Sequence, residues 1–390
     1  MNPDLIVIGG GVMGTSTAYH AARAGARVRL IEQFRIGHTR GSSHGASRII
    51  RLAYAQPEYV SLAQRAYDLW RELERESGAQ LYFRTGGLDF GVPEAHGLQE
   101  IGQNYRERGI AHEAMTADEM MRRFPQLNLP GETIGFYQPD YGMLHADRCV
   151  ATQAEQARRH GAEICEDELV TKITAHADSV EVHTTKREHH AARAVLCAGS
   201  WMRPLAQQIG LDLPLTVQKE QVQYMPAHDP RAFEIGRFPL FIHRFVGTTS
   251  LAAGFPILGH TCPKFLIDHV GVQVDPEDKD RSVDEPLRER VRDYALGVVR
   301  GLTGEVAEAV SCRYTMTSDE DFRLGAHPQH RHIVLASPCS GHGFKFGSVI
   351  GQIVADAVLR GDASVSPRFA WRDAGIHPAP ASKTAQAGEI

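Results

Sequence analysis

Three glycines near the amino terminus have the spacing of a phosphate-binding turn. Gly9, Gly11 and Gly14 form the pattern Gly-x-Gly-x-x-Gly. Glycine at the first position permits a tight turn, at the second it lets the backbone approach a pyrophosphate, and at the third it lets a helix pack closely on a strand. The phosphates then lie against the positive N-terminal end of that helix. The pattern therefore predicts a dinucleotide site.

The segments around these glycines have the pattern of a strand–helix–strand unit. Residues 5–8 predict a buried strand, residues 15–24 a helix, and residues 26–31 a second strand. Glu32 closes the second strand. A carboxylate there accepts hydrogen bonds from the adenosine ribose and disfavours the 2′-phosphate of NADP. This unit alone is compatible with NAD and with FAD.

The rest of the chain does not continue as a simple series of helix–strand units. A polar, glycine-rich loop at residues 37–45 precedes a helix that apolar residues at helical spacing predict over residues 57–77. A buried strand at residues 194–199 would return the chain to the nucleotide sheet. Another strand at residues 333–336 leads through a second glycine-rich turn into a helix over residues 344–359. This second junction could contact another part of an extended cofactor.

Composition restricts the class of protein and its partners. The 390 residues suit about two domains, and the net charge of −5 gives no basic field for nucleic acid or an anionic membrane. The sequence shows no secretory signal and no stretch near the roughly 20 apolar residues that span a bilayer. The six cysteines are scattered without a Cys-x-x-Cys pair, so we expect no metal site, no disulfide framework and a reducing cytoplasm.

Several further runs stand out besides the first glycine motif, namely residues 41–51 (GSSHGASRIIR), 198–201 (AGSW), 254–256 (GFP), Lys264, 312–315 (CRYT) and 340–346 (SGHGFKF). With these runs, the sequence resembles the monomeric sarcosine oxidase and N-methyltryptophan oxidase family, whose members are FAD-dependent amine oxidases of the glycine-oxidase/D-amino-acid-oxidase group. The resemblance covers roughly residues 4–370. It implies FAD as the cofactor, which the nucleotide unit leaves open.

The combined pattern predicts an α/β protein with a Rossmann-like FAD-binding domain and an inserted α+β substrate domain built on a mixed sheet. Each domain takes separate pieces of the chain. We expect the FAD-binding domain in residues 1–80, 146–214 and 311–375, the substrate domain in residues 81–145 and 215–310, and a flexible tail in residues 376–390.

The resemblance implies that Cys312 forms a thioether with the 8α carbon of FAD, which would hold the flavin and raise its potential. Taken alone, Cys312 would be a small buried hydrophobic residue. The residues expected to bind FAD are Gly9, Gly11, Gly14, Glu32, Ser42, Ser43, Arg51, Val170, Cys312, Gly341 and Gly343.

Two cations match the family's pair that holds the substrate carboxylate, and they are Arg48 and Lys345. A planar guanidinium binds a carboxylate bidentately, and an ammonium adds a point charge. Arg51 follows Arg48 by three residues, so on a helix both would face one site, with Arg51 near the flavin or on the substrate side.

Three more residues match positions beside the flavin. Lys264 matches a lysine near flavin N5 that is implicated in oxygen activation, since a cation stabilises the superoxide formed first. His44 and Tyr314 match residues that line the cavity between flavin and substrate. The alternatives are a loop histidine bonded to backbone and a tyrosine buried in the core.

The sequence departs from the family pattern at two positions. Ala253 stands before Gly-Phe-Pro, where relatives commonly have an aromatic residue, so we expect a wider cavity. Asp268 stands four residues after Lys264, where the family has histidine, and His269 follows it. The sequence therefore leaves open whether the substrate is sarcosine or a different amine.

The resemblance implies oxidation of a small amine-bearing carboxylic acid, namely sarcosine or another N-substituted amino acid. A hydride equivalent passes from the neutral amine to flavin N5, the imine hydrolyses, and O2 reoxidises the flavin to give hydrogen peroxide. The alternatives are an oxidase of a bulkier or cyclic substrate (a glycated amino acid or pipecolate-like imino acid), a dehydrogenase, and a non-catalytic flavoprotein subunit. We expect a monomer or weak oligomer.

Overall fold

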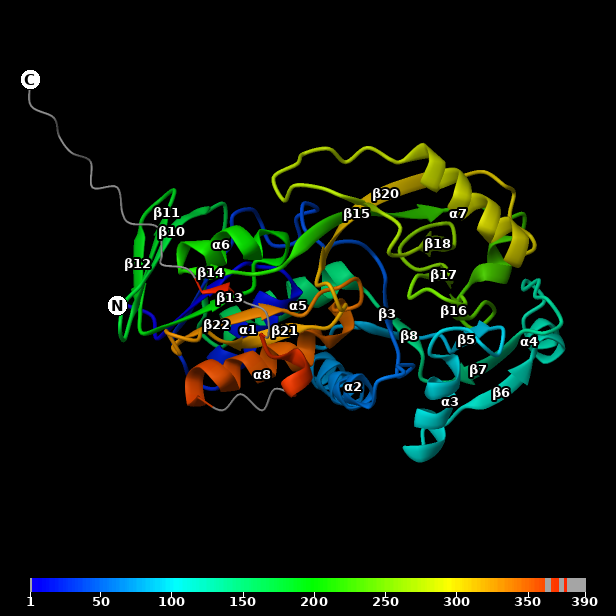
Figure 1. The fold of residues 1–390 in the computed structure, drawn as a ribbon, viewed down its shortest axis with the longest axis horizontal. Helices are drawn as coiled ribbons and strands as arrows, with labels where there is room; N and C mark the ends of the chain where they lie inside the picture. The colour runs from blue at the N-terminus through cyan, green and yellow to red at the C-terminus, as the bar shows by residue number, and fades with distance from the viewer. Residues whose placement is uncertain (1, 362–365, 372–374, 377–390) are drawn as a thin grey trace, which may run out of the picture.

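The strand predicted over residues 5–8 lies inside a six-stranded sheet in the computed structural model, which describes residues 2–361, 366–371 and 375–376 (Figure 1). Its strands, in order across the sheet, are β21 (Arg323–Ala326), β22 (Ile333–Ser337), β13 (Arg193–Leu196), β1 (Leu5–Ile8), β2 (Val28–Ile31) and β9 (Glu163–Cys165). Neighbours run parallel except β21 and β22. Leu5 and Val7 enter one core and Ile6 and Ile8 another, so both faces of β1 are covered and its apolar run is uninterrupted.

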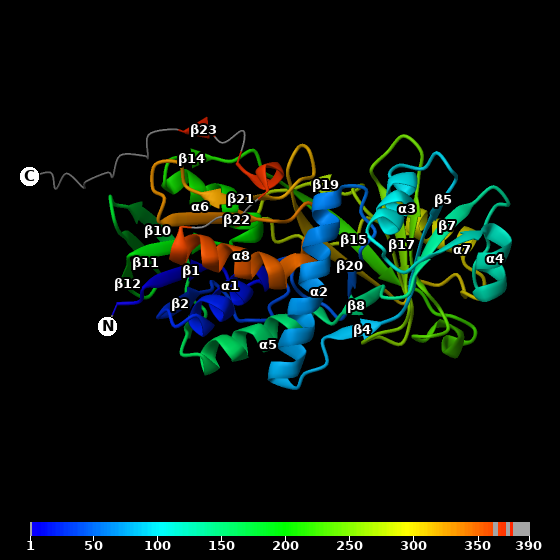
Figure 2. The ribbon, with the colours of Figure 1, turned by 90° about the horizontal axis from the view of Figure 1, so that it is seen from below.

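Three helices cover one face of this sheet. They are α1 (Val12–Arg23), α5 (Ala146–Arg159) and α8 (Gly347–Arg360), which lie side by side in Figure 2. The longer helix α2 (Pro57–Ser77) packs against α8 and stands between the two halves of the molecule in that view. It begins with a proline in its first turn and ends at Gly78 in the left-handed conformation, the common stop signal of a helix.

A smaller antiparallel sheet covers the opposite face, at the end of the molecule away from the second half (Figure 1). It consists of β10 (Val170–Ala175), β11 (Val180–Thr184) and β12 (Glu188–Ala191), and α6 (Met202–Gln208) completes the layer. The short strands β14 (Leu211–Asp212) and β23 (Gly375–Ile376) pair with each other. Ile376, which the sequence assigns to the tail, is thus in a strand, and residues 377–390 lie outside the described residues.

The second half of the molecule is built on a nine-stranded mixed sheet (Figure 1). Its strands, in order, are β19 (Val272–Gln273), β15 (Thr216–Tyr224), β18 (Lys264–Ile267), β17 (Leu251–Phe255), β16 (Leu240–Arg244), β5 (Gly87–Gly91), β7 (Ile134–Gln138) and β6 (Glu113–Thr116), with β20 (Glu308–Met316) paired to β15. Helices α3 (Leu98–Glu107), α4 (Ala117–Arg123) and α7 (Glu285–Val298) pack on it. A core that contains Phe90, Phe241 and Phe265 joins the sheet to α4 and α7, whereas the buried apolar residues of α3 belong to the core of the first half.

A three-stranded sheet joins the amino-terminal segment to the second half. It consists of β3 (Arg48–Ile50), β8 (Gly142–Leu144) and β4 (Tyr82–Arg84), with both pairs antiparallel. The polar loop before β3 therefore reaches the place where the two halves meet, which is where the predicted site residues concentrate.

The predicted fold class is confirmed, with a parallel nucleotide sheet and a separate mixed sheet. The helix predicted over residues 57–77 forms with those bounds, and the one predicted over residues 344–359 begins instead with a short 3₁₀ turn (Phe344–Phe346) before α8. β20 runs past the boundary expected at residue 311, and the division of the chain into domains stays a prediction. In the parts of the chain that the structure describes, every helix is too short or too polar to cross a bilayer.

Candidate active site

A cavity of about 1140 Å³ lies between the nucleotide sheet and the mixed sheet. Its walls include the ends of β1 and β2 on one side and residues of β15, β17, β18 and β20 on the other. It exceeds the roughly 300–1,000 Å³ of ordinary ligand pockets, so it has room for an extended cofactor and a substrate. Of the residues that the sequence predicts for the site, all but Gly14 line this cavity.

The first glycine turn has a backbone that other residues would not permit. Gly9 has φ +105°, and a Cβ on Gly14 would lie 1.8 Å from the carbonyl oxygen of Gly9, so α1 can pack this closely on β1 only with glycine there. A Cβ on Gly11 would meet only the Ser43 side chain, so its backbone faces the cavity. The Ser43 hydroxyl accepts the N–H of Val12 at 3.1 Å, in the first turn of α1.

Glu32 connects the end of β2 to this turn. Its Oε2 accepts the N–H of Gly10 at 2.6 Å, and its Oε1 accepts the N–H of Phe34 at 2.8 Å. Each carboxylate oxygen still has acceptor capacity for a ribose hydroxyl. The carboxylate therefore holds the turn in place and presents to the cavity the hydrogen-bond acceptor that the sequence predicts.

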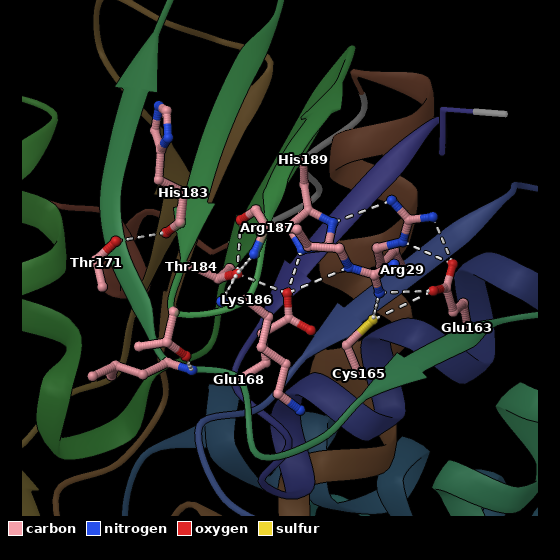
Figure 3. A network of polar contacts seen from close by, with 12 residues as sticks. Arg29, Glu163, Cys165, Glu168, Thr171, His183, Thr184, Lys186, Arg187 and His189 are labelled. Atoms are coloured by element: carbon pink, nitrogen blue, oxygen red, sulfur yellow. Dashed lines mark hydrogen bonds and ion pairs between the residues drawn. The ribbon is translucent and has the colours of Figure 1, made fainter.

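A buried polar network fixes the neighbouring wall, which Glu168 and Val170 line (Figure 3). Arg29, which can only donate, lies 3.1 Å from Nδ1 of His189. His189 therefore donates from Nε2 to Glu168 at 2.6 Å, and its side chain is fully buried. The backbone N–H of Glu168 donates to the carbonyl of Glu32 at 2.9 Å, so this network positions the wall against the end of β2.

Cys312 lies on β20 toward the other end of the cavity. Burial raises the pKa of its thiol to about 11, while Arg48 opposes that shift. The Ser42 hydroxyl donates to the carbonyl of Arg313, the next residue of β20, and so joins the glycine-rich loop to this strand. The second glycine turn also lies here, with Gly341 at φ +77° and no room for a Cβ beside Tyr314.

The first of two cation pairs consists of Arg48 and Lys264. The Arg48 guanidinium donates to the carbonyls of Ser42, His44 and Ser47 at 3.2, 2.6 and 2.9 Å. The Lys264 ammonium donates to the carbonyl and hydroxyl of Ser47 at 2.9 and 2.6 Å. Burial lowers the pKa of Lys264 well below its usual range, and Arg48 lowers it further. Arg48 thus shapes the loop beside Lys264.

The second pair consists of Arg51 and Lys345, and it differs from the predicted pairing. Lys345 Nζ donates to the Tyr54 hydroxyl at 2.9 Å and the His342 carbonyl at 2.7 Å. The Arg51 guanidinium lies 4.4 Å from the centre of the Tyr54 ring, and its buried Nη1 has no hydrogen-bond partner among the described residues. Burial lowers the pKa of Lys345 well below its usual range, with a further contribution from Arg51.

The expectation that Arg48 and Arg51 face one site from a helix is wrong. Arg48–Ile50 forms strand β3, and residues three apart on an extended chain point to opposite faces. Arg48 consequently turns toward Lys264, and Arg51 turns toward Lys345.

Acidic groups lie next to the second pair. Asp268 faces the cavity, and its Oδ1 accepts the N–H of Leu251 at 2.7 Å. Burial raises its pKa, while His269 and the Leu251 hydrogen bond oppose the shift. Although burial disfavours its cation, the carboxylate of Glu320, 3.3 Å from Nδ1, raises the pKa of His269 to about 9. This end of the cavity therefore presents both signs of charge.

His44 and Tyr314 both line the cavity, as expected. Burial lowers the pKa of His44 to about 4, so it is a neutral ring at pH 7, and Arg48 adds to this effect. Burial raises the pKa of Tyr314 well above its usual value, and its ring stands edge-on to His269 at 6.1 Å between centres. These two residues supply neutral, polar edges rather than charge.

Comparison with known proteins identifies the family. The sequence profile of the family described as FAD dependent oxidoreductase matches residues 4–357. The chain belongs to this family. Monomeric sarcosine oxidase from Streptomyces avermitilis is 35% identical over 92% of this chain and 94% of its own. Human peroxisomal sarcosine oxidase is 33% identical, over 92% of each chain, and N-methyl-L-tryptophan oxidase from Salmonella arizonae is 30% identical, over 92% of this chain and 95% of its own.

Solved structures agree with the fold of this FAD-dependent oxidoreductase. NikD, an amino acid oxidase essential for nikkomycin biosynthesis, superposes with a TM-score of 0.84 at 24% identity, over 95% of this chain and 98% of its own. Glycine oxidase from Geobacillus kaustophilus superposes with a TM-score of 0.78 at 20% identity, over 95% and 99%. The predicted family and fold, and FAD as cofactor, are confirmed.

The residues of this cavity fit FAD. The Gly9 turn offers backbone and a helix N-terminus to the pyrophosphate, and Glu32 faces the cavity beside it. The cavity then continues to Cys312 and to the two cation pairs. A dinucleotide fits this arrangement with its nucleotide end at the Gly9 turn and its redox-active ring near Cys312 and the cation pairs.

Three residues that contact the predicted site residues or their neighbours were not found by the sequence analysis. Tyr54 bonds Lys345 and lies over Arg51, Ser47 holds Lys264, and Glu320 holds His269. Ser47 stands directly before Arg48 inside the quoted run, so its place was available from the sequence. Tyr54 and Glu320 lie outside every motif and are identified only by contacts across the fold.

The sequence predicts no metal site. In the described ranges, one group of side chains has ligand atoms within 4.8 Å of one another, and it consists of Glu181, Glu188 and His190. It lies on β11 and β12, on the small sheet away from the mixed sheet (Figure 1). These residues do not line the cavity and have no part in its chemistry.

Proposed function

We propose that this protein oxidises a small amino acid with a secondary amine, such as sarcosine or another N-substituted amino acid, and passes the electrons to O2. The single observation that supports this most is the separation of the two cation pairs within one cavity. One pair is available for a carboxylate, and the other is available for oxygen chemistry.

The substrate carboxylate binds Arg51 and Lys345. Arg51 has a buried donor without a hydrogen bond, and Lys345 Nζ bonds only a hydroxyl and a carbonyl among the described residues, so an added carboxylate satisfies both. This assignment replaces Arg48 by Arg51, because the Arg48 guanidinium already donates to three carbonyls. Asp268 then faces the amine end of the bound substrate.

FAD supplies the acceptor for the hydride equivalent from the C–H bond next to the amine nitrogen, and the resulting imine is released to water. The protein positions that bond by holding the carboxylate. Lys264 provides a cation, or a donor, for reduced oxygen species on the way to hydrogen peroxide. Cys312 anchors the cofactor through a thioether. Six free cysteines are compatible with a reducing cytoplasm, and a monomer or weak oligomer stays a prediction.

Two measurements test the proposal. The protein is precipitated with acid, and the flavin in pellet and supernatant is quantified. The native protein is then screened with N-alkyl amino acids in a peroxide-coupled assay. A yellow pellet with peroxide from a secondary amine is expected. A colourless protein, or a flavoprotein that reduces with none of these amines, contradicts the proposal, whereas flavin found wholly in the supernatant removes only the Cys312 link.

A further inference from the structure

A carboxyl group that the proposed reaction does not use lies directly opposite Cys312. In the antiparallel pair β15–β20, Glu220 is the partner of Cys312. Directly opposed residues project from the same face with Cβ atoms about 4.5–5.5 Å apart. Val222, Tyr224 and Tyr314 line the cavity from that face. Glu220 and Cys312 are therefore side-chain neighbours on the face of the sheet that borders the cavity, with Cys312 at its wall and Glu220 buried beside it.

Glu220 has one oxygen in use and one free. It is 2% exposed, and its Oε1 accepts the N–H of Gly271 at 3.0 Å. Its Oε2 is buried without a hydrogen bond to any described residue. Burial raises the pKa of Glu220 to about 7, against the effect of the Gly271 hydrogen bond, with Asp268 adding to the rise and His269 opposing it. Near neutral pH this carboxyl group can both accept and release a proton.

Formation of a thioether at Cys312 requires that its thiol lose a proton. With its pKa raised to about 11 by burial, the thiolate fraction at pH 7 is on the order of 10⁻⁴. The guanidinium groups of Arg48 and Arg281 favour the thiolate but, being already protonated, do not take up its proton. Lys264, whose pKa burial lowers, is the rival acceptor in its neutral form, since its nitrogen donates to the carbonyl and the hydroxyl of Ser47 and keeps a lone pair; exchange of each residue separates the two acceptors.

We propose that Glu220 accepts the thiol proton of Cys312 as the thioether to the 8α carbon of FAD forms. The inference rests on the proposed Cys312 link. The S–H bond and one C–H bond of the flavin 8-methyl group break, and one C–S bond forms. The two electrons and two protons released pass to dioxygen, which becomes hydrogen peroxide, and Glu220 holds the proton from sulfur before its release.

The test follows the linkage in full-length protein that is made without flavin and then mixed with FAD. In the wild type, the rate at which flavin becomes acid-stable should rise with pH through about 7, as the Glu220 carboxyl group loses its proton. In Glu220→Gln the rate should fall at least about tenfold and lose that rise, since a positioned base contributes roughly 10²–10⁴-fold. Glu308→Gln, on β20 like Cys312 and on the same face of the sheet but with a side chain that is 54% exposed, is the matched control and should behave like the wild type.

A second readout separates this role from a structural one. The Glu220 carboxylate raises the pKa of Cys312, so Glu220→Gln should lower it and speed alkylation of Cys312 by iodoacetamide in the flavin-free protein. If Glu220 is the proton acceptor, its loss should give faster alkylation of Cys312 together with slower formation of the flavin linkage. Slower alkylation together with slower linkage would indicate a disturbed site and would overturn the assignment.

The remaining outcomes also decide. Wild-type rate and pH profile in Glu220→Gln would overturn the proposal, and so would a profile that disappears only in Lys264→Gln. If Glu220→Gln does not fold, Glu220→Asp takes its place. This variant should form the flavin linkage slowly, and its rate should still rise with pH. A rate that does not rise with pH, in Glu220→Asp and in the wild type, counts against Glu220. Amine oxidation by a wild type without acid-stable flavin would overturn this inference and leave the proposed function standing.

Discussion

Exchanging each arginine of the β3 segment for methionine tests which one holds the substrate. Arg51 is 6% exposed, lies over the Tyr54 ring, and keeps a buried N–H without a partner. Loss of one partner from a buried, hydrogen-bonded charge pair costs about 2–5 kcal/mol. Arg51→Met should therefore raise the dissociation constant of a carboxylate ligand about 30- to 4,000-fold. In Arg48→Met the dissociation constant should change less than about threefold, because the Arg48 guanidinium already donates its hydrogen bonds to backbone carbonyls.

The assay titrates the holoenzyme with a thioether analogue of the substrate, which has the carboxylate but no oxidisable amine, and follows the flavin spectrum. The Arg51 variant should fold, because Asp89 keeps an ion pair with Arg244 at 2.9 Å and lies 4.0 Å from Arg51. Thermal melting and flavin content check this. Weaker binding in Arg48→Met than in Arg51→Met would refute the assignment and restore the pairing first expected from the sequence.

Three other predictions concern Lys264, Lys345 and Gly14. Lys264→Met should slow reoxidation by O2 far more than reduction by substrate in stopped-flow traces, since the buried Lys264 amine serves the second step only, and equal slowing would contradict that role. Burial lowers the pKa of Lys345, and a bound carboxylate favours its charged form. Affinity for the thioether analogue should therefore fall as pH rises through that lowered pKa. A dissociation constant that does not change with pH, or the same fall in Lys345→Met, counts against this. Gly14→Ala should lower stability by about 1–3 kcal/mol and reduce flavin content, because its Cβ would lie 1.8 Å from the Gly9 carbonyl oxygen, while Gly131→Ala, with open space around it, should melt like the wild type.

Features encoded within a short stretch of chain were predictable from the sequence. The Gly9 turn, β2 and Glu32 lie within one strand–helix–strand unit, so their spacing is sufficient to place them. Helix α2 has apolar residues at helical spacing, a proline in its first turn and a glycine directly after its last residue, and its bounds agree with the prediction.

Contacts made by distant strands were not predictable in the same way. Glu220 meets Cys312 only through the register of β15 and β20, which are separated along the chain by the strands β16 to β19 and helix α7. The direction of Arg48 depends on whether its segment is extended or helical, and pairing with β8, far along the chain, settles that. A spacing of three residues is compatible with a shared helix face, so only the pairing partner reveals that the two arginines diverge.

The two departures from the family pattern act on the same part of the cavity. Ala253 on β17 lies directly opposite Leu266 on β18, and Asp268 continues the β18 ladder two residues further, bonded to Leu251. Diagonal neighbours in such a pair lie about 7–8 Å apart, within reach of an aromatic ring. A ring at position 253 would therefore extend over Leu266 toward the Asp268 carboxyl group, whereas alanine leaves this carboxyl group open to the cavity. Space and negative charge thus come together, so Asp268→Asn should weaken binding of an amine-bearing ligand more than binding of its thioether analogue. Equal weakening of both ligands would mean that Asp268 only supports the wall and does not face the amine.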